Sequence, residues 1–149
     1  MKIPEEIKES MDKSVLCWLA TVSSEGMPNV SPKEVFTYFK DEIIIANIAS
    51  PQTVKNILTN SLVCISFIDI LVQKGYKVKG HASIINKKNE LFEDRELELL
   101  KITEGKFPFN SLTSITIKEH HKIIAPKYIL YPDTTEDAQV KSARSTYGF

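Results

Sequence analysis

Residues 43–57 constrain the fold of this chain most, because an apolar strand runs straight into the start of a helix. The strand is the run Ile43-Ile44-Ile45-Ala46-Asn47, and Ile48-Ala49 breaks it. Ser50 suits the N-cap position, and Pro51 suits the first helical position because its missing N–H would have no partner inside the helix. The following apolar residues, Val54, Ile57 and Leu58, then predict one apolar helix face.

The start of this helix is a candidate anion site. A helix N-terminus attracts anions through its free backbone N–H groups and its partial positive charge. The hydroxyls of Ser50 and Thr53 and the amide of Gln52 lie beside those groups, so the site suits a phosphate monoester such as the end of a flavin or nucleotide. The alternative is that Ser50 and Pro51 only cap the helix, as they do in most proteins.

Short strands separated by hairpin turns make up most of the remaining chain. Apolar or alternating runs predict strands at 15–22, 28–31, 33–39, 62–69, 75–85 and 114–123, and an edge strand at 128–131. The turns of two hairpins are expected at residues 23–26 and 40–42. Helical spacing predicts an opening helix through Ile3, Ile7 and Met11, a charged helix at about 90–102 and a last helix at 135–143.

This order of elements predicts a mainly β fold, an antiparallel, Greek-key-like barrel with helices packed on it, rather than a parallel sheet. The 149 residues, 42% of them hydrophobic, suffice for one domain spanning 1–149. The 19 basic and 19 acidic residues produce no basic field, which disfavours nucleic acid as a partner. No apolar run reaches membrane-spanning length and no signal core opens the chain, so we expect a cytoplasmic protein without a membrane partner.

The cysteines and histidines indicate neither a disulfide nor a metal site. Cys17 and Cys64 lie in separate apolar runs and are expected as buried free thiols. The three histidines lack partners at ligand spacing, and the two adjacent ones lie in a predicted strand, where they point to opposite faces. Trp18, in a run that is apolar on both sides, is expected in the core. Neither a nucleophile elbow nor a nucleotide-binding glycine loop is present, so no catalytic residue is assigned.

Five short motifs occur in a distinctive order. They are Trp18-Leu19-Ala20-Thr21-Val22, Gly26-Met27-Pro28-Asn29-Val30-Ser31-Pro32, Ile45-Ala46-Asn47, residues 50–57, and Gly75-Tyr76-Lys77-Val78-Lys79-Gly80-His81-Ala82. Together they resemble the pyridoxamine 5′-phosphate oxidase-related, FMN-binding split-barrel flavoproteins over roughly residues 10 to 125. The resemblance implies a homodimer that holds FMN in grooves at the subunit interface.

The resemblance also implies which residues contact the cofactor. The phosphate and ribityl contacts fall on the helix start, at Ser50, Gln52 and Thr53, with Asn56 nearby. The preceding strand lies along the isoalloxazine ring with Ile45, Ala46 and Asn47. A paired strand faces the ring or the phosphate with Ser31, Pro32 and Lys33, of which Lys33 is the strongest single candidate because a cation there offsets the phosphate charge. The neighbouring subunit closes over the flavin with Lys74, Gly75 and Tyr76.

Two positions depart from the family pattern. Many relatives carry Lys or Arg where Gln52 stands, so the compensating charge is expected from Lys33, Lys55, Lys79 or the partner subunit. Arg144 has no His nearby to complete the pair with which true pyridoxamine 5′-phosphate oxidases grip their substrate. We therefore expect an FMN-dependent oxidoreductase of another specificity, with NADH or NADPH as a candidate hydride donor. Two alternatives stay open: a non-catalytic FMN-binding or electron-transfer module, and a reductase that uses the deazaflavin F420.

Overall fold

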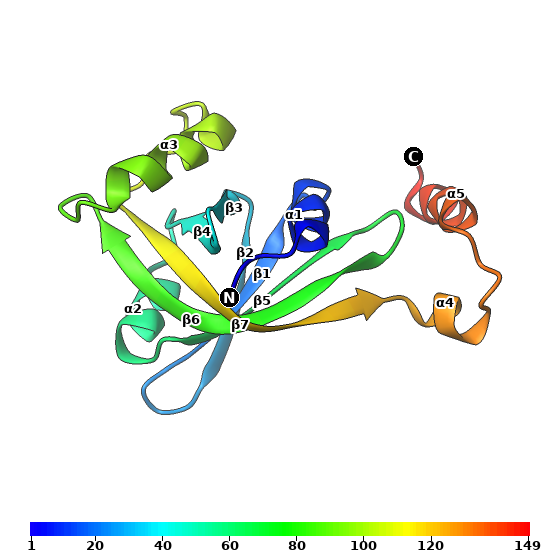
Figure 1. Cartoon of the computed structure of the whole chain (residues 1–149), viewed down its shortest axis with the longest axis horizontal. Coiled ribbons are helices and arrows are strands. Elements are labelled where there is room, and N and C mark those ends of the chain that lie inside the picture. The colour runs from blue at the N-terminus through cyan, green and yellow to red at the C-terminus, as the bar shows by residue number, and fades with distance from the viewer.

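The computed structural model, which describes residues 1–149, contains a seven-stranded antiparallel sheet that curls into a half-barrel (Figure 1). The strand order is β2-β1-β5-β6-β7-β4-β3. The strands are β1 (Cys17–Val22), β2 (Pro28–Lys33), β3 (Phe36–Phe39), β4 (Glu42–Ala46), β5 (Leu62–Asp69), β6 (Lys74–Asn86) and β7 (Ser111–Ile124). The two edge strands, β2 and β3, follow each other in the chain but do not pair, so the barrel is split between them. The predicted antiparallel barrel is confirmed.

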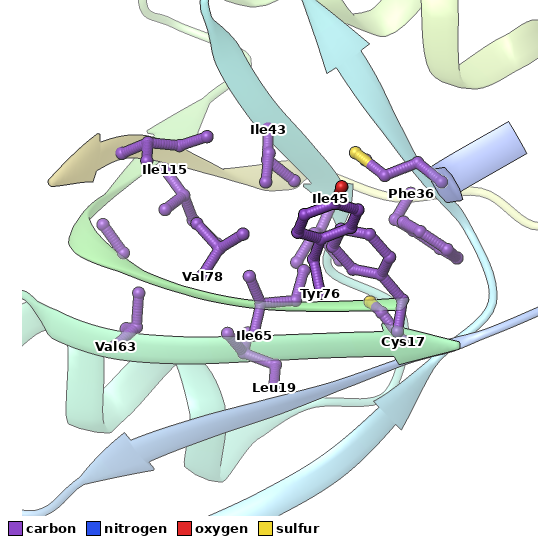
Figure 2. Packing of buried hydrophobic residues seen from close by; sticks show 14 of the residues in the cluster. Cys17, Leu19, Phe36, Ile43, Ile45, Val63, Ile65, Tyr76, Val78 and Ile115 are labelled. Carbon is purple, nitrogen blue, oxygen red and sulfur yellow. The ribbon is translucent and has the colours of Figure 1, made fainter. Parts of the chain in front are cut away.

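The main hydrophobic core fills the inside of the curl. Because side chains alternate along a strand, every second residue of β1, β5 and β6 points inward. Figure 2 shows these side chains meeting those of β4 and β7 in one interior. The labelled members of this cluster are Cys17, Leu19, Phe36, Ile43, Ile45, Val63, Ile65, Tyr76, Val78 and Ile115.

Helices close the openings of the half-barrel. Helix α1 (Glu5–Asp12) packs on β3, β5 and β6 and buries Ile7 and Met11 in the main core, as its spacing predicts. Helix α2 (Pro51–Thr59) connects β4 to β5 and packs on β6, β1 and β2. Helix α3 (Phe92–Thr103) covers a second, smaller cluster against β3, β4 and β7.

Two C-terminal helices lie apart from this assembly. They are α4 (Pro126–Leu130) and α5 (Glu136–Tyr147), and they follow the end of β7 at the opposite end of the molecule from α3 (Figure 1). No residue after Ile117 belongs to either hydrophobic cluster. The C-terminal segment therefore lies outside both clusters, although Gln139 and Ala143 of α5 are buried against their own chain.

An ion pair fixes α3 to the sheet. The guanidinium of Arg95 donates to Glu42 Oε2 from Nη2 at 2.8 Å and from Nε at 2.9 Å. Ser114 Oγ donates to the same oxygen at 2.8 Å, and Arg95 also lies over the ring of Phe39. Because Arg95 is buried, this cluster secures the wall of the barrel beside β4.

Several predictions about individual elements are wrong. Residues 128–131 do not form an edge strand, because Pro126 opens a short helix instead. Trp18 is 46% exposed, since the inward positions of β1 belong to its neighbours Cys17 and Leu19. On α2 Leu58 is exposed, and the buried face contains Thr53, Asn56 and Ile57. Of the two free cysteines, only Cys17 is buried, while Cys64 is half-buried.

Candidate functional site

The centre of the site is Lys33, the last residue of β2. Lys33 lies opposite Cys17 in the β1–β2 pairing and faces inward, so only 5% of it is exposed. Its ammonium group donates hydrogen bonds to Ser50 Oγ and, at 3.4 Å, to Thr53 Oγ1. No carboxylate forms an ion pair with it. Burial without an anionic partner lowers the pKa of Lys33, because desolvation penalises the charged form.

The start of α2 supplies further donors next to this cation. Ser50 occupies the predicted N-cap position, but its hydroxyl donates to Ile48 O at 3.0 Å and does not cap the helix. The backbone N–H groups of Gln52 and Thr53 therefore have no acceptor. Ala49 precedes them at φ 50°, a left-handed conformation that costs a non-glycine residue about 1 kcal/mol. This turn aims the helix start at Lys33.

A third hydroxyl joins the cluster from β2. Ser31 Oγ lies 3.1 Å from Thr53 Oγ1, two residues before Lys33 on the same inward face. The structure thus brings together four of the predicted residues, Ser31, Lys33, Ser50 and Thr53. A cation and two free N–H groups, with three hydroxyls that now bond to protein atoms but can rotate, form an arrangement that suits a phosphate group.

Gln52 and Asn56 belong to a neighbouring hydrogen-bonded chain. Gln52 Nε2 donates to Asn56 Oδ1 at 2.8 Å, and Asn56 Nδ2 donates to Thr21 Oγ1 at 2.9 Å. Asn56 is buried, so this chain ties α2 to β1. In this structure the Asn56 amide is used by Gln52 and Thr21, and only Gln52 stands at the helix start.

Asn47 lines one of two cavities that flank the cluster. Its amide is oriented by β7, since Asn47 Nδ2 donates to Ser111 Oγ at 3.0 Å and Thr113 Oγ1 donates to Asn47 Oδ1 at 2.7 Å. The cavity has a volume of about 480 Å³ and is lined by Asn47, Ser50, Pro51, Val54, Lys55, Leu58 and Ser111. Lys55 therefore faces the same space as the N-cap hydroxyl.

The second cavity has more hydrophobic residues in its lining and lies on the β2 side of Lys33. Its volume is about 230 Å³, and it is lined by Pro32, Lys33, Glu34, Val35, Ala46, Ile48 and Phe107. Pro32 and Ala46 are predicted site residues, whereas Ile45 points into the main core and offers only its backbone. Ligand pockets usually measure about 300–1,000 Å³, so this cavity is smaller than a typical ligand pocket.

Phe107 is a lining residue that sequence reasoning missed. It lies in the loop between α3 and β7, far along the chain from β2, and its ring is exposed. An isolated aromatic residue in a loop has no periodic signal. In the sequence it is only an aromatic residue next to Pro108, and the folded structure alone shows which cavity it lines.

Lys74, Gly75 and Tyr76 lie away from this cluster, at the start of β6. Lys74 pairs with Glu136 of α5 at 2.8 Å. Gly75 lies so close to β5 that a Cβ would overlap the carbonyl oxygen of Phe67. The ring of Tyr76 points into the core (Figure 2). Within one chain, these residues do not meet Lys33.

The described structure contains no group of three or more His, Cys, Asp or Glu side chains placed to hold a metal ion. None of its helices combines the length and the apolar character needed to cross a bilayer.

Comparison with known proteins identifies the family. A sequence profile for the family described as pyridoxamine 5′-phosphate oxidase matches residues 3–118. Since this match covers most of the sequence, the chain belongs to the pyridoxamine 5′-phosphate oxidase family, and the resemblance noted from its motifs is confirmed. A search of curated protein sequences finds no significant match.

Solved structures share the fold. HupZ of Group A Streptococcus is 25% identical with a TM-score of 0.69, covering 80% of this chain and 93% of its own. HutZ of Vibrio cholerae, described as a heme storage protein, is 20% identical with a TM-score of 0.66, covering 83% and 95%. An FMN-binding protein of Syntrophomonas wolfei is 16% identical with a TM-score of 0.64, covering 81% and 86%. The curled sheet of this chain is therefore the split barrel of that family.

Proposed function

We propose that this chain is an FMN-binding oxidoreductase that works as a homodimer and that does not oxidise pyridoxamine 5′-phosphate. One observation carries the proposal: Lys33 is a buried residue whose ammonium group contacts two hydroxyls and has no anion of its own. A buried charge is costly unless it is paired. A phosphate monoester at the start of α2 supplies the missing partner.

The chain's own residues bind the phosphate in this proposal. Lys33 supplies the charge, and the N–H groups at the start of α2 donate to the phosphate. The hydroxyls of Ser31, Ser50 and Thr53 turn from their present hydrogen bonds to donate to it as well. Lys33 thereby replaces the cation that is absent at Gln52. Lys79 is a weaker candidate because it already pairs with Glu119 at 3.1 Å.

The isoalloxazine ring fits the apolar side of Lys33. Pro32, Ala46, Ile48 and Phe107 offer it a nonpolar surface, and the open side of this cavity leaves room for residues of a second subunit. Residues 74–76 of the second copy are the candidates that the resemblance implies, because within one chain they lie elsewhere.

Bound FMN supplies hydride and electron transfer, while the protein orients the ring and excludes water. Arg144, the one C-terminal arginine, is exposed on α5, outside the part of the chain that matches the family. No residue pair for gripping pyridoxamine 5′-phosphate is therefore assigned. NADH or NADPH remains the proposed hydride donor, since reduction needs an accessible face of the ring.

The decisive experiment compares FMN with riboflavin, which differs only by the phosphate. We expect purified protein to release FMN, identified by absorbance spectrum and mass, and to bind FMN at least tenfold more tightly than riboflavin. FAD, F420 and hemin are titrated in parallel. Equal affinity for FMN and riboflavin, or tighter binding of F420 or hemin, contradicts the proposed site.

A second experiment separates enzyme from carrier. The FMN-saturated protein is mixed with NADH or NADPH and a panel of acceptors, and steady turnover supports the oxidoreductase. If FMN binds tightly but neither nicotinamide reduces it at a useful rate, the non-catalytic electron-transfer module is the better interpretation.

A further inference from the structure

The C-terminal arm, defined here as residues 126–149, is the part of the chain least attached to the rest. It lies beyond the segment that matches the family, which ends at residue 118, and it contributes nothing to either hydrophobic cluster. Its attachments are few: Tyr128 Oη donates to Val72 O at 2.6 Å, Lys74 lies over the Tyr128 ring, and Lys74 pairs with Glu136. Beyond Glu136, no side chain of α5 makes a hydrogen bond or ion pair with the barrel.

The arm also exposes large apolar side chains. Ile129, Leu130 and Tyr131 are consecutive and are 66%, 70% and 67% exposed. On α5 only Gln139 and Ala143 are buried. Gln139 is 4% and Ala143 2% exposed, so one face of α5 already packs on its own chain, and the uncovered apolar surface of the arm lies at Ile129, Leu130 and Tyr131.

The solvent-accessible surface area of the chain also indicates a missing partner. A compact monomer of 16.9 kDa is expected to expose about 7,700 Å², whereas this chain exposes 9110 Å². The excess is about 1,400 Å², and a stable dimer buries about 800 Å² per partner. The chain therefore carries the surplus surface that an intimate dimer requires.

A complementary apolar surface exists on the same chain. Val15, Leu16, Trp18, Ile68 and Ile70 line most of a groove of about 430 Å³. From this groove the outward positions of β1 and β2 continue as an apolar strip, in which Trp18 pairs with Pro32, Ala20 with Val30 and Val22 with Pro28.

We infer that the C-terminal arm clasps a second copy of this chain, with Ile129, Leu130 and Tyr131 seated in the groove lined by Val15, Trp18 and Ile70. The inference rests on the homodimer of the proposed function but not on FMN. Arm and groove are both exposed within one chain, so the arm does not fill its own groove. In a two-fold dimer, each copy has one arm and one groove. The arm of each copy lies in the groove of the other, so the dimer contains two such contacts.

The net charge does not oppose self-association. With 19 basic and 19 acidic residues, two copies carry no net charge and do not repel each other. When two copies meet, no net charge separates them, and the apolar arm of one faces the apolar groove of the other.

The first test measures the oligomeric state by light scattering and sedimentation velocity. Wild-type protein is expected at twice 16.9 kDa. Replacement of Ile129, Leu130 and Tyr131 by Ser is expected to weaken the dimer about a hundredfold or more while leaving the circular dichroism of the barrel intact. The matched control is Leu97→Ser, an exposed leucine on α3.

The two proposals fail in distinguishable ways. A wild-type monomer overturns both the homodimer and the clasp. A wild-type dimer that the triple variant leaves unchanged overturns the clasp alone. A stable dimer that binds FMN no more tightly than riboflavin contradicts the cofactor site and leaves the clasp standing.

The second test locates the arm by cross-linking. In a Cys64→Ser background, a Val15→Cys chain is mixed with a Leu130→Cys chain and treated with a short bis-maleimide. A cross-linked product of twice the chain mass is expected, and a Leu97→Cys chain in place of the Leu130→Cys chain is expected to yield none. A single chain that carries both Val15→Cys and Leu130→Cys is treated in the same way. If it cross-links only within itself, both at high dilution and at a concentration where the dimer forms, the inference is overturned.

Discussion

Replacing Lys33 by Met is expected to change cofactor affinity and protein stability in opposite directions. Met retains most of the length of the lysine stem and removes the ammonium group. In the apo-protein Lys33 is buried without an anion, while in the proposed FMN complex its ammonium group faces the phosphate. One substitution therefore tests whether the phosphate explains the buried charge.

The expected magnitudes follow from the contacts. A charge-assisted hydrogen bond contributes about 1.5–3 kcal/mol, which corresponds to about a 10- to 150-fold loss of FMN affinity. Replacing a buried ion pair by well-packed apolar residues is often neutral or stabilises proteins by about 1–4 kcal/mol, and Lys33 has no paired anion whose attraction would be lost. The two hydroxyls that Lys33 contacts retain other partners, since Ser50 donates to Ile48 O and Thr53 bonds with Ser31. We therefore expect apo-Lys33→Met to be more stable than the wild type.

The pH dependence provides an internal check. The folded pKa of Lys33 is lowered, so between that value and the usual 10.5 the unfolded chain binds more protons than the folded chain. The apo wild type gains stability as pH rises through this window, because the buried ammonium group becomes neutral. The advantage of Lys33→Met is thus largest near neutral pH and shrinks toward pH 10.5.

The assays are flavin-fluorescence titration and urea unfolding of the apo-protein, with Lys88→Met as the matched control. Lys88 is an exposed lysine in the turn between β6 and α3, so its loss changes net charge by the same amount without touching the site. The reasoning is refuted if Lys33→Met loses FMN and riboflavin affinity equally, or if the apo variant is less stable than the wild type.

Four further predictions concern other parts of the molecule. Thr53→Val keeps the side-chain shape but removes the hydroxyl, and we expect it to weaken FMN about tenfold in the same titration while leaving riboflavin binding unchanged; equal losses for both ligands would argue against a phosphate contact. Arg95→Met leaves Glu42 without its cation, so urea unfolding should show a loss of about 1–3 kcal/mol with unaltered FMN affinity. Burial raises the pKa of Cys17 from 9.0 to about 12, so the unfolded thiol ionises first and stability should fall above pH 9.0 with a slope approaching about 1.4 kcal/mol per pH unit, a slope that Cys17→Ala reduces. An aerobic assay for pyridoxal 5′-phosphate with FMN-saturated protein should show no steady turnover of pyridoxamine 5′-phosphate, because Arg144 has no His beside it to orient the substrate; multiple turnover at low substrate would make the vitamin oxidase the better interpretation.

Local chemistry in the sequence was enough to predict the strand and helix at 43–57. An N-cap residue, a proline at the first helical position and a run of isoleucines are short-range signals, and the structure contains β4 and α2 there. The order of strands and turns likewise predicted an antiparallel barrel, and the family resemblance implied that the barrel is split. The order of the motifs, through the family resemblance, then indicated that Lys33 and Thr53 belong to one site, although they are 20 residues apart in the sequence.

Which face of an element is buried was harder to predict. Trp18 and Leu58 are apolar but exposed, because the register of β1 and the docking of α2 assign the interior to their neighbours. Residues 128–131 combine apolar and aromatic side chains that suit a strand. However, β7, which precedes them, is already paired on both sides with β6 and β4, and Pro126 starts a helix.

The sequence by itself determined the elements, their order and the kinds of side chain available to a phosphate. The tertiary structure alone decided that the Lys33 ammonium is buried with no carboxylate in reach, that Phe107 faces the same cavity, and that the arm after residue 125 lies outside the core. The physical reason is that desolvation and charge pairing depend on which distant segments meet. Asn47 and Ser111, 64 residues apart, become hydrogen-bond partners only when β4 and β7 pair.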